Sequence, residues 1–90
     1  MKRVHLIIRG DVQGVSFRAW TIQQARELGV TGWVRNKDDG TVEIVAEGNR
    51  ASLEELAARC QRGPEMAQVV KVEVNWSKAS GEFFRFEVVL

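Results

Sequence analysis

The sequence predicts an α+β fold in which two helices cover one face of a mainly antiparallel sheet. Several segments alternate apolar and polar residues, which is typical of strands with one buried face. Two other segments place apolar residues at helical spacing, which predicts helices with one buried face. Elements that each bury a single face pack as two layers. With 90 residues, 44% of them hydrophobic and 28% charged, we expect residues 1–90 to form one domain.

The first predicted strand covers residues 2–9 and runs into the stretch Gly10–Arg18, which holds two glycines and leads into a helix. A loop that ends at a helix N-terminus points unpaired backbone N–H groups and the positive end of the helix dipole at one place. Such a place can bind a phosphate-sized anion, and Arg18 would add a planar fork of donors. From these residues alone, a glycine-containing turn beside a surface arginine is equally open.

The helix is predicted over Phe17–Leu28, with Gly29 as its left-handed C-terminal cap. Its apolar positions are Phe17, Trp20, Ala25 and Leu28, with Ile22 flanking. We expect the Ser16 hydroxyl to cap the N-terminal end. The alternative, Ser16 as a nucleophile, is disfavoured because no base is identifiable beside it.

A β-hairpin follows, with predicted strands over residues 30–37 and 41–47. The Asp39-Gly40 pair between them is among the strongest hairpin signals in a sequence. Asn36 stands at the end of the first of these strands. An asparagine beside a turn usually bonds to nearby backbone, so this position alone favours a structural role.

A second helix is predicted up to about Arg62, with Asn49 and Ser52 as competing N-caps and Gly63-Pro64 as its end. Cys60 falls on the apolar stripe of this helix, which favours a buried hydrophobe over a reactive thiol. The last two predicted strands are residues 68–76 and residues 84–89, the second with an apolar face of Phe84, Phe86 and Val88.

This order of elements fits a two-layer sandwich of the ferredoxin-like βαββαβ type with an additional C-terminal strand. In that layout the first strand is central, so its exit loop lies beside neighbouring strand ends. The fold by itself hosts many functions and decides none of them.

Charge and cysteine content narrow the possible partners. The chain has 13 basic and 12 acidic residues and a formal charge of +1, which gives no electrostatic footprint for nucleic acid or an anionic membrane. No stretch is apolar enough for a signal peptide or a membrane span, and the one cysteine cannot form an intramolecular disulfide. We therefore expect a cytoplasmic protein. An RNA-binding sheet is disfavoured because residues 41–47 contain no aromatic side chain.

Several site chemistries do not fit the motifs. The loop after the first strand lacks the Gly-Lys-Ser/Thr of a Walker A motif, and it contains no cysteine for a phosphocysteine route. One histidine and one distant cysteine cannot build a transition-metal cluster, so we expect no metal and no cofactor. We expect His5 to be a surface residue rather than a base, and Asp38 and Asp39 to be solvated turn residues rather than a magnesium site.

Two motifs resemble the signatures of the acylphosphatases. Gly10-Asp11-Val12-Gln13-Gly14-Val15-Ser16-Phe17-Arg18 resembles the first. Gly32-Trp33-Val34-Arg35-Asn36, followed by Asp39-Gly40-Thr41-Val42 and Gly48, resembles the second. The Gly63-Pro64 break and the closing strand are also similar to that family, so the resemblance covers essentially the whole chain.

The resemblance implies a small, metal-free enzyme that hydrolyses the carboxyl–phosphate bond of acyl phosphates on a ferredoxin-like fold. It implies that Arg18 binds the phosphate and that Asn36 orients the attacking water. The residues whose backbone amides would hold the phosphate are Gln13, Gly14, Val15, Ser16 and Phe17. Ser16 stands where the family is variable, and Trp20 stands at a position associated with tyrosine, which leaves fine substrate preference open.

The residue types suit that chemistry. The leaving group of an acyl phosphate is a carboxylate whose conjugate acid has a pKa of roughly 4, so it departs without being protonated. Phosphoryl transfer needs mainly positioning and charge stabilisation. An asparagine carboxamide can accept a hydrogen bond from water and donate one to a phosphate oxygen, but it is not a strong base. We expect the proton to pass to a phosphate oxygen of the substrate.

Two alternatives stay open. A domain related to this family forms the N-terminal part of larger hydrogenase-maturation proteins. The first alternative is therefore an enzyme that acts on carbamoyl phosphate, although an end at Leu90 favours a stand-alone enzyme. A non-catalytic phosphate- or ligand-binding module is the other, and the presence of both Arg18 and Asn36 argues against it. We expect a monomer that binds a small acyl phosphate, with inorganic phosphate as product and inhibitor, and no nucleic-acid or membrane partner.

Overall fold

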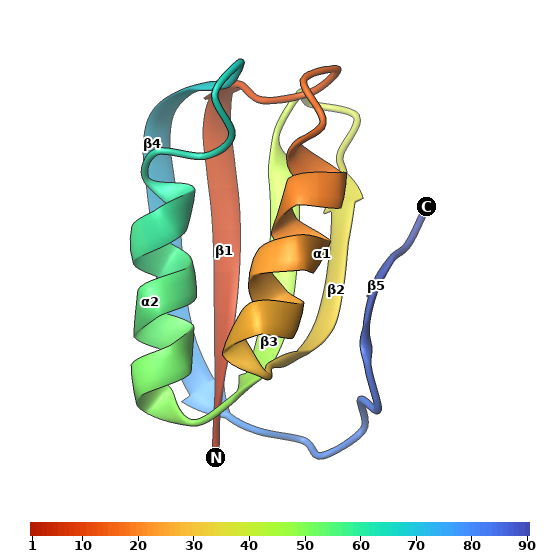
Figure 1. Ribbon diagram of the computed structural model, residues 1–90, viewed down its shortest axis with the longest axis vertical. Coiled ribbons are helices and arrows are strands. Elements are labelled where there is room, and N and C mark those ends of the chain that lie inside the picture. The colour runs from red at the N-terminus through yellow and green to blue at the C-terminus, as the bar shows by residue number, and fades with distance from the viewer.

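Two helices lie side by side on one face of a five-stranded sheet in the computed structural model, which describes residues 1–90 (Figure 1). The elements in chain order are β1 (Lys2–Asp11), α1 (Phe17–Leu28), β2 (Thr31–Asn36), β3 (Val42–Gly48), α2 (Arg50–Cys60), β4 (Gln68–Lys78) and β5 (Phe86–Val88). The strands are ordered β4-β1-β3-β2-β5, and every neighbouring pair is antiparallel except β2 and β5. The predicted two-layer fold with an additional C-terminal strand is confirmed.

The core lies between the sheet and the helices because alternate side chains of the strands point to the same face. Leu6 of β1 stands opposite Ile44 of β3 and Val74 of β4, and both Leu6 and Ile44 are fully buried. The helices contribute Phe17, Ala25, Leu53, Leu56 and Cys60 to this layer. Cys60 is buried as predicted, and its burial raises the pKa of the thiol to about 12.

Helix ends follow the sequence signals only in part. Gly29 adopts the left-handed conformation at the end of α1, as predicted. Of the two candidate caps of α2, Asn49 holds the position, and its side chain accepts a hydrogen bond from the Ser52 N–H at 2.8 Å. Thr21 of α1 is fully buried although its side chain is polar. Burial is tolerated because its hydroxyl donates a hydrogen bond to the Phe17 carbonyl at 2.8 Å.

The last strand is shorter than predicted, and the prediction that its apolar face is buried is wrong for two of the three residues. Only Phe86 is buried, whereas Phe84 is 95% exposed and Val88 is 39% exposed. The reason is that β5 pairs with β2 through three residues at the sheet edge, so the segment before it lies outside the core. No helix in the chain is both long enough and apolar enough to cross a membrane.

Glu47 anchors the segment that carries the chain from β4 to β5. It lies on the sheet face without helices, and its side chain is only 4% exposed. The carboxylate accepts hydrogen bonds from the Ser80 N–H at 2.7 Å, the Gly81 N–H at 3.0 Å and the Arg3 Nε at 2.7 Å. Burial by itself raises the pKa of Glu47, but these hydrogen bonds outweigh burial and lower the pKa to about 2.

We predict that Glu47→Gln lowers the free energy of unfolding by about 2–3 kcal/mol at pH 7, because the hydrogen bonds to a charged acceptor are weakened. The folded-state pKa of about 2 lies below the ordinary value of 4.5, so this stabilisation is complete above pH 4.5. It disappears as the pH falls from 4.5 toward 2. Urea unfolding followed by tryptophan fluorescence at several pH values measures it.

Glu65→Gln is the matched control, since Glu65 is exposed and forms no ion pair. Wild type and the control should lose more stability between pH 5 and pH 2 than Glu47→Gln does. Equal pH dependence in all three proteins would contradict the role of Glu47.

Candidate active site

The loop between β1 and α1 presents a row of backbone donors that the protein does not use. None of the N–H groups of residues 13–19 donates a hydrogen bond to a backbone carbonyl. Gly14 has φ 76° and Ser16 has φ 64°, and Ser16 is the one non-glycine residue with a positive φ. Left-handed residues within a turn bring successive N–H groups to the same concave side, which is the geometry of an anion-binding nest. The loop lies at the N-terminal end of α1 (Figure 1).

The expectation that the Ser16 hydroxyl caps α1 is wrong. A capping side chain needs an extended backbone at the cap residue, whereas Ser16 is left-handed and makes no side-chain cap bond. Its carbonyl still accepts the first hydrogen bond of the helix, from the Trp20 N–H at 3.0 Å. The first N–H groups of α1 therefore stay available to a ligand.

Arg18 adds a positive charge that is not neutralised within the protein. Most other arginines pair with carboxylates, as Arg3 does with Glu47 and Arg35 with Glu43. Arg18 stands in the first turn of α1 and is half-buried, yet it forms no ion pair and no side-chain hydrogen bond. The helix N-terminus and the guanidinium both favour an anion at this end of α1.

Asn36 supplies an unpartnered polar group in the interior. It is the last residue of β2, opposite Val42, and its side chain shares the helix-facing side of the sheet with Val34. Its Oδ1 is the one buried side-chain nitrogen or oxygen in the molecule without a hydrogen-bond partner. Leaving such an atom unpaired costs about 1–3 kcal/mol, so its presence points to a ligand or water that uses it. Asn36 also lines a cavity of about 460 Å³ at the β2–β3 turn.

The side chain of Gln13 joins the loop to the strand end that carries Asn36. Its Nε2 donates to the Lys37 carbonyl at 2.7 Å and to the Thr41 carbonyl at 2.9 Å. Lys37 follows Asn36 directly, and the Lys37 N–H bonds to the Thr41 carbonyl at 2.9 Å across the turn. Sequence reasoning assigned only the backbone N–H of Gln13, because nothing in the local sequence shows which distant carbonyls a loop carboxamide reaches.

Asp39 accepts hydrogen bonds within the same turn. Its Oδ1 accepts the Thr41 hydroxyl at 2.6 Å and the Thr41 N–H at 3.0 Å, and these bonds lower the pKa of the carboxyl. No group of three or more His, Cys, Asp or Glu side chains is arranged to hold a metal ion.

His5 lies on the opposite face of the sheet from Asn36. Its Nε2 is 2.7 Å from Glu43 Oε2, while Glu43 Oε1 accepts from Arg35 Nε at 2.6 Å. Burial raises the pKa of Glu43, but these two hydrogen bonds outweigh it and lower the pKa overall. The histidine is thus half-buried and hydrogen-bonded to Glu43 rather than a plain surface residue, and it does not face the loop.

Comparisons with known proteins show the family of the chain. A family model described as Acylphosphatase matches residues 4–88. The chain is 51% identical over 89 residues to an acylphosphatase of Methylococcus capsulatus, with 99% of this chain and 97% of that protein covered.

Solved structures are similar along the whole chain. The crystal structure of acylphosphatase from Bacillus subtilis matches with a TM-score of 0.96 and 34% identity, and both chains are covered completely. A full-length HypF in a phosphate- and nucleotide-bound form matches with a TM-score of 0.87 and 25% identity, over 99% of this chain but only 12% of HypF. Since the family model spans nearly all residues and half of them are identical to a curated member, the chain belongs to the acylphosphatase family.

Proposed function

We propose that this protein is an acylphosphatase, which uses water to hydrolyse the carboxyl–phosphate bond of acyl phosphates. The observation that carries the proposal is that two sets of polar groups without hydrogen-bond partners are linked by one side chain. A row of free N–H groups beside Arg18 stands next to the strand end that holds the unpartnered Asn36, and Gln13 joins the two. We take residues 1–90 as one catalytic domain.

In this proposal the phosphoryl group binds at the N-terminus of α1. The backbone amides of Gln13, Gly14, Val15, Ser16 and Phe17 donate to its non-bridging oxygens. Arg18 donates to two of the oxygens at once and supplies positive charge close to them. Donors fixed before substrate arrives stabilise the charge of the transition state without reorganising. The proposed reaction therefore calls for no metal and no cofactor.

Asn36 positions the nucleophile in this proposal. Its carboxamide oxygen accepts a hydrogen bond from a water molecule that attacks phosphorus in line with the bond to the acyl oxygen. That bond breaks, and its electron pair leaves with the carboxylate. Because the carboxylate is a weak base, no general acid is needed. The proton of the attacking water passes to a phosphate oxygen.

Two other assignments use the same residues. The likeness to a segment of HypF keeps an enzyme that prefers carbamoyl phosphate as an alternative. The second alternative is a non-catalytic phosphate-binding module. The unpartnered Asn36 Oδ1 disfavours this alternative, because phosphate binding alone does not require a group that orients water. We also propose that the protein acts in the cytoplasm as a monomer, in line with its single, buried cysteine.

Arg18→Ala and Asn36→Ala separate binding from turnover. We expect Arg18→Ala to lose most of its affinity for phosphate and to fall about 10²–10³-fold in kcat/KM, the usual effect of removing one oxyanion donor. Asn36→Ala should still fold and bind phosphate but lose at least about 10²-fold in kcat. Phosphate release from benzoyl phosphate, with phosphate affinity by calorimetry, measures both.

Arg26→Ala is the control for Arg18→Ala, since Arg26 lies in the last turn of the same helix and forms no ion pair. It should leave kcat/KM unchanged. Near-normal turnover in the Arg18 and Asn36 variants would sink the assignment, and a folded wild type that binds phosphate without hydrolysing any acyl phosphate would favour the non-catalytic module.

Gln13→Glu tests whether the loop must be held against the β2–β3 turn. The new carboxylate faces two carbonyl oxygens and has no donor while ionised, so we expect a loss of up to about 10²-fold in kcat at pH 7. Its pKa should be raised, and protonation restores one donor. Activity relative to wild type should therefore recover as the pH falls from 7 to 5.

Gln13→Leu provides the comparison, because it lacks a donor at every pH. Its activity relative to wild type should be low and independent of pH. A flat profile for Gln13→Glu as well would show that the two hydrogen bonds do not govern turnover.

Inorganic phosphate and chelators report on the proposed binding mode. Phosphate should inhibit competitively, because it occupies the same backbone donors as the phosphoryl group of the substrate. Excess EDTA should leave the initial rate unchanged. A rate that falls with EDTA and returns on addition of Mg²⁺ would show that a metal supplies charge that the proposal gives to Arg18.

A further inference from the structure

We propose that the cavity between α1 and α2 binds the acyl group of the substrate and favours acyl groups with an aromatic part or a second negative charge. The inference rests on the proposed function. The cavity has a volume of about 550 Å³, larger than the one beside Asn36. Its walls are formed by Trp20, Glu55, Ala58, Arg59, Arg62 and Gly63.

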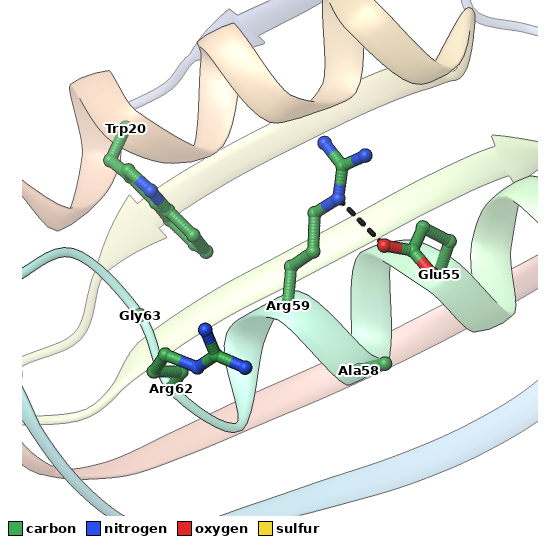
Figure 2. A pocket seen from close by; sticks show the side chains of 6 residues that line it. All are labelled: Trp20, Glu55, Ala58, Arg59, Arg62 and Gly63. Carbon is green, nitrogen blue, oxygen red and sulfur yellow. Dashed lines mark hydrogen bonds and ion pairs between the residues drawn. The ribbon is translucent and has the colours of Figure 1, made fainter.

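The cavity combines an aromatic face with one unpaired cation. Figure 2 shows Trp20 reaching down from α1 while Arg59 and Arg62 approach from the C-terminal end of α2. Arg59 is already paired, because its Nε donates to Glu55 at 2.9 Å and its Nη1 donates to Glu27 at 3.0 Å and to Gln24 at 2.8 Å. Arg62 forms no ion pair and no side-chain hydrogen bond in the structure. The Arg62 guanidinium is therefore the one charged group of the cavity wall without a partner in the protein, and it faces a ligand together with the indole of Trp20.

The cavity lies next to the proposed phosphate site. Phe17 begins α1 directly after the loop, and its ring meets the Trp20 ring edge-on with the centroids 5.3 Å apart. Gly63 also lies close to Phe17, since an added Cβ would lie 2.7 Å from the ring. Phe17, whose backbone N–H belongs to the proposed phosphate site, thus lies against two residues of the cavity wall, Trp20 and Gly63.

The direction of the proposed reaction sends the acyl group toward this side. Asn36 belongs to β2, whereas Trp20 lines a cavity shared with α2, and Figure 1 shows α1 lying between α2 and β2. Arg18 and Trp20 are two residues apart, so they point about 200° apart around the helix. In an in-line displacement the leaving group departs opposite the attacking water. Water held by Asn36 on the β2 side places the leaving carboxylate on the α2 side.

The chemistry of the walls sets the preferred acyl group. A flat aromatic acyl group can stack on the indole of Trp20 and bury apolar surface there. A second carboxylate at the far end of an acyl group can pair with Arg62. Acetyl, which has neither feature, gains little from the cavity and serves as the baseline substrate.

The experiment measures kcat/KM for acetyl, benzoyl and succinyl phosphate with wild type, Trp20→Leu and Arg62→Gln. We expect Trp20→Leu to lower the benzoyl-to-acetyl ratio roughly tenfold. Arg62→Gln should lower the succinyl-to-acetyl ratio about 3- to 5-fold, mainly through KM, because the ion pair is partly exposed to water. Trp20→Phe, which keeps an aromatic face, should retain most of the preference for benzoyl phosphate.

Arg26→Gln is the matched charge control and should change neither ratio, since Arg26 lies at the other end of α1. Ratios to acetyl phosphate also correct for any loss of folded protein. If all three substrates are hydrolysed and neither ratio changes in the Trp20 and Arg62 variants, the acyl subsite is overturned while the proposed function stands. If folded wild type hydrolyses none of the three, the proposed function fails and the subsite fails with it.

Discussion

Two hydrogen bonds from one carboxamide hold together the two parts of the proposed site. In the sheet β1 and β2 are separated by β3, so the loop after β1 and the end of β2 have no ladder that joins them directly. Gln13 bridges the gap by donating to the carbonyls of Lys37 and Thr41. Gln13 thereby links the free N–H groups and Asn36, the two parts of the proposed site, which belong to different elements of secondary structure.

The site is made from groups that folding leaves unsatisfied. The N–H groups of residues 13–19 have no backbone acceptor, Asn36 Oδ1 is buried without a partner, and Ser16 holds a left-handed conformation that costs about 1 kcal/mol or more. These costs fall on one end of the molecule. Burial of the core between the sheet and the helices offsets these costs. Glu47 holds the segment between β4 and β5 through hydrogen bonds that involve none of the proposed site residues.

Local patterns predicted the elements well, because alternation and helical spacing report directly which face of a strand or helix is buried. They failed where the deciding contact is distant or depends on a backbone angle. A serine before a helix is normally a cap, and only its left-handed φ shows that Ser16 is not. Phe84 has the spacing of a core residue but falls where β5 has not yet joined β2. The bonds of Gln13 span 24 and 28 residues, so no window of sequence reveals them.

Helix α1 divides the proposed site by function. In the proposed mechanism its N-terminus faces the phosphoryl group, β2 carries Asn36, which orients the attacking water, and α2 is followed by Arg62, which pairs with the acyl group. In this proposal the residues on the α2 side contact only the acyl group. Substitutions there can retune which acyl group is accepted while the transition state for phosphoryl transfer keeps the same donors. Selectivity and rate are then separable in this fold because they depend on opposite sides of one helix.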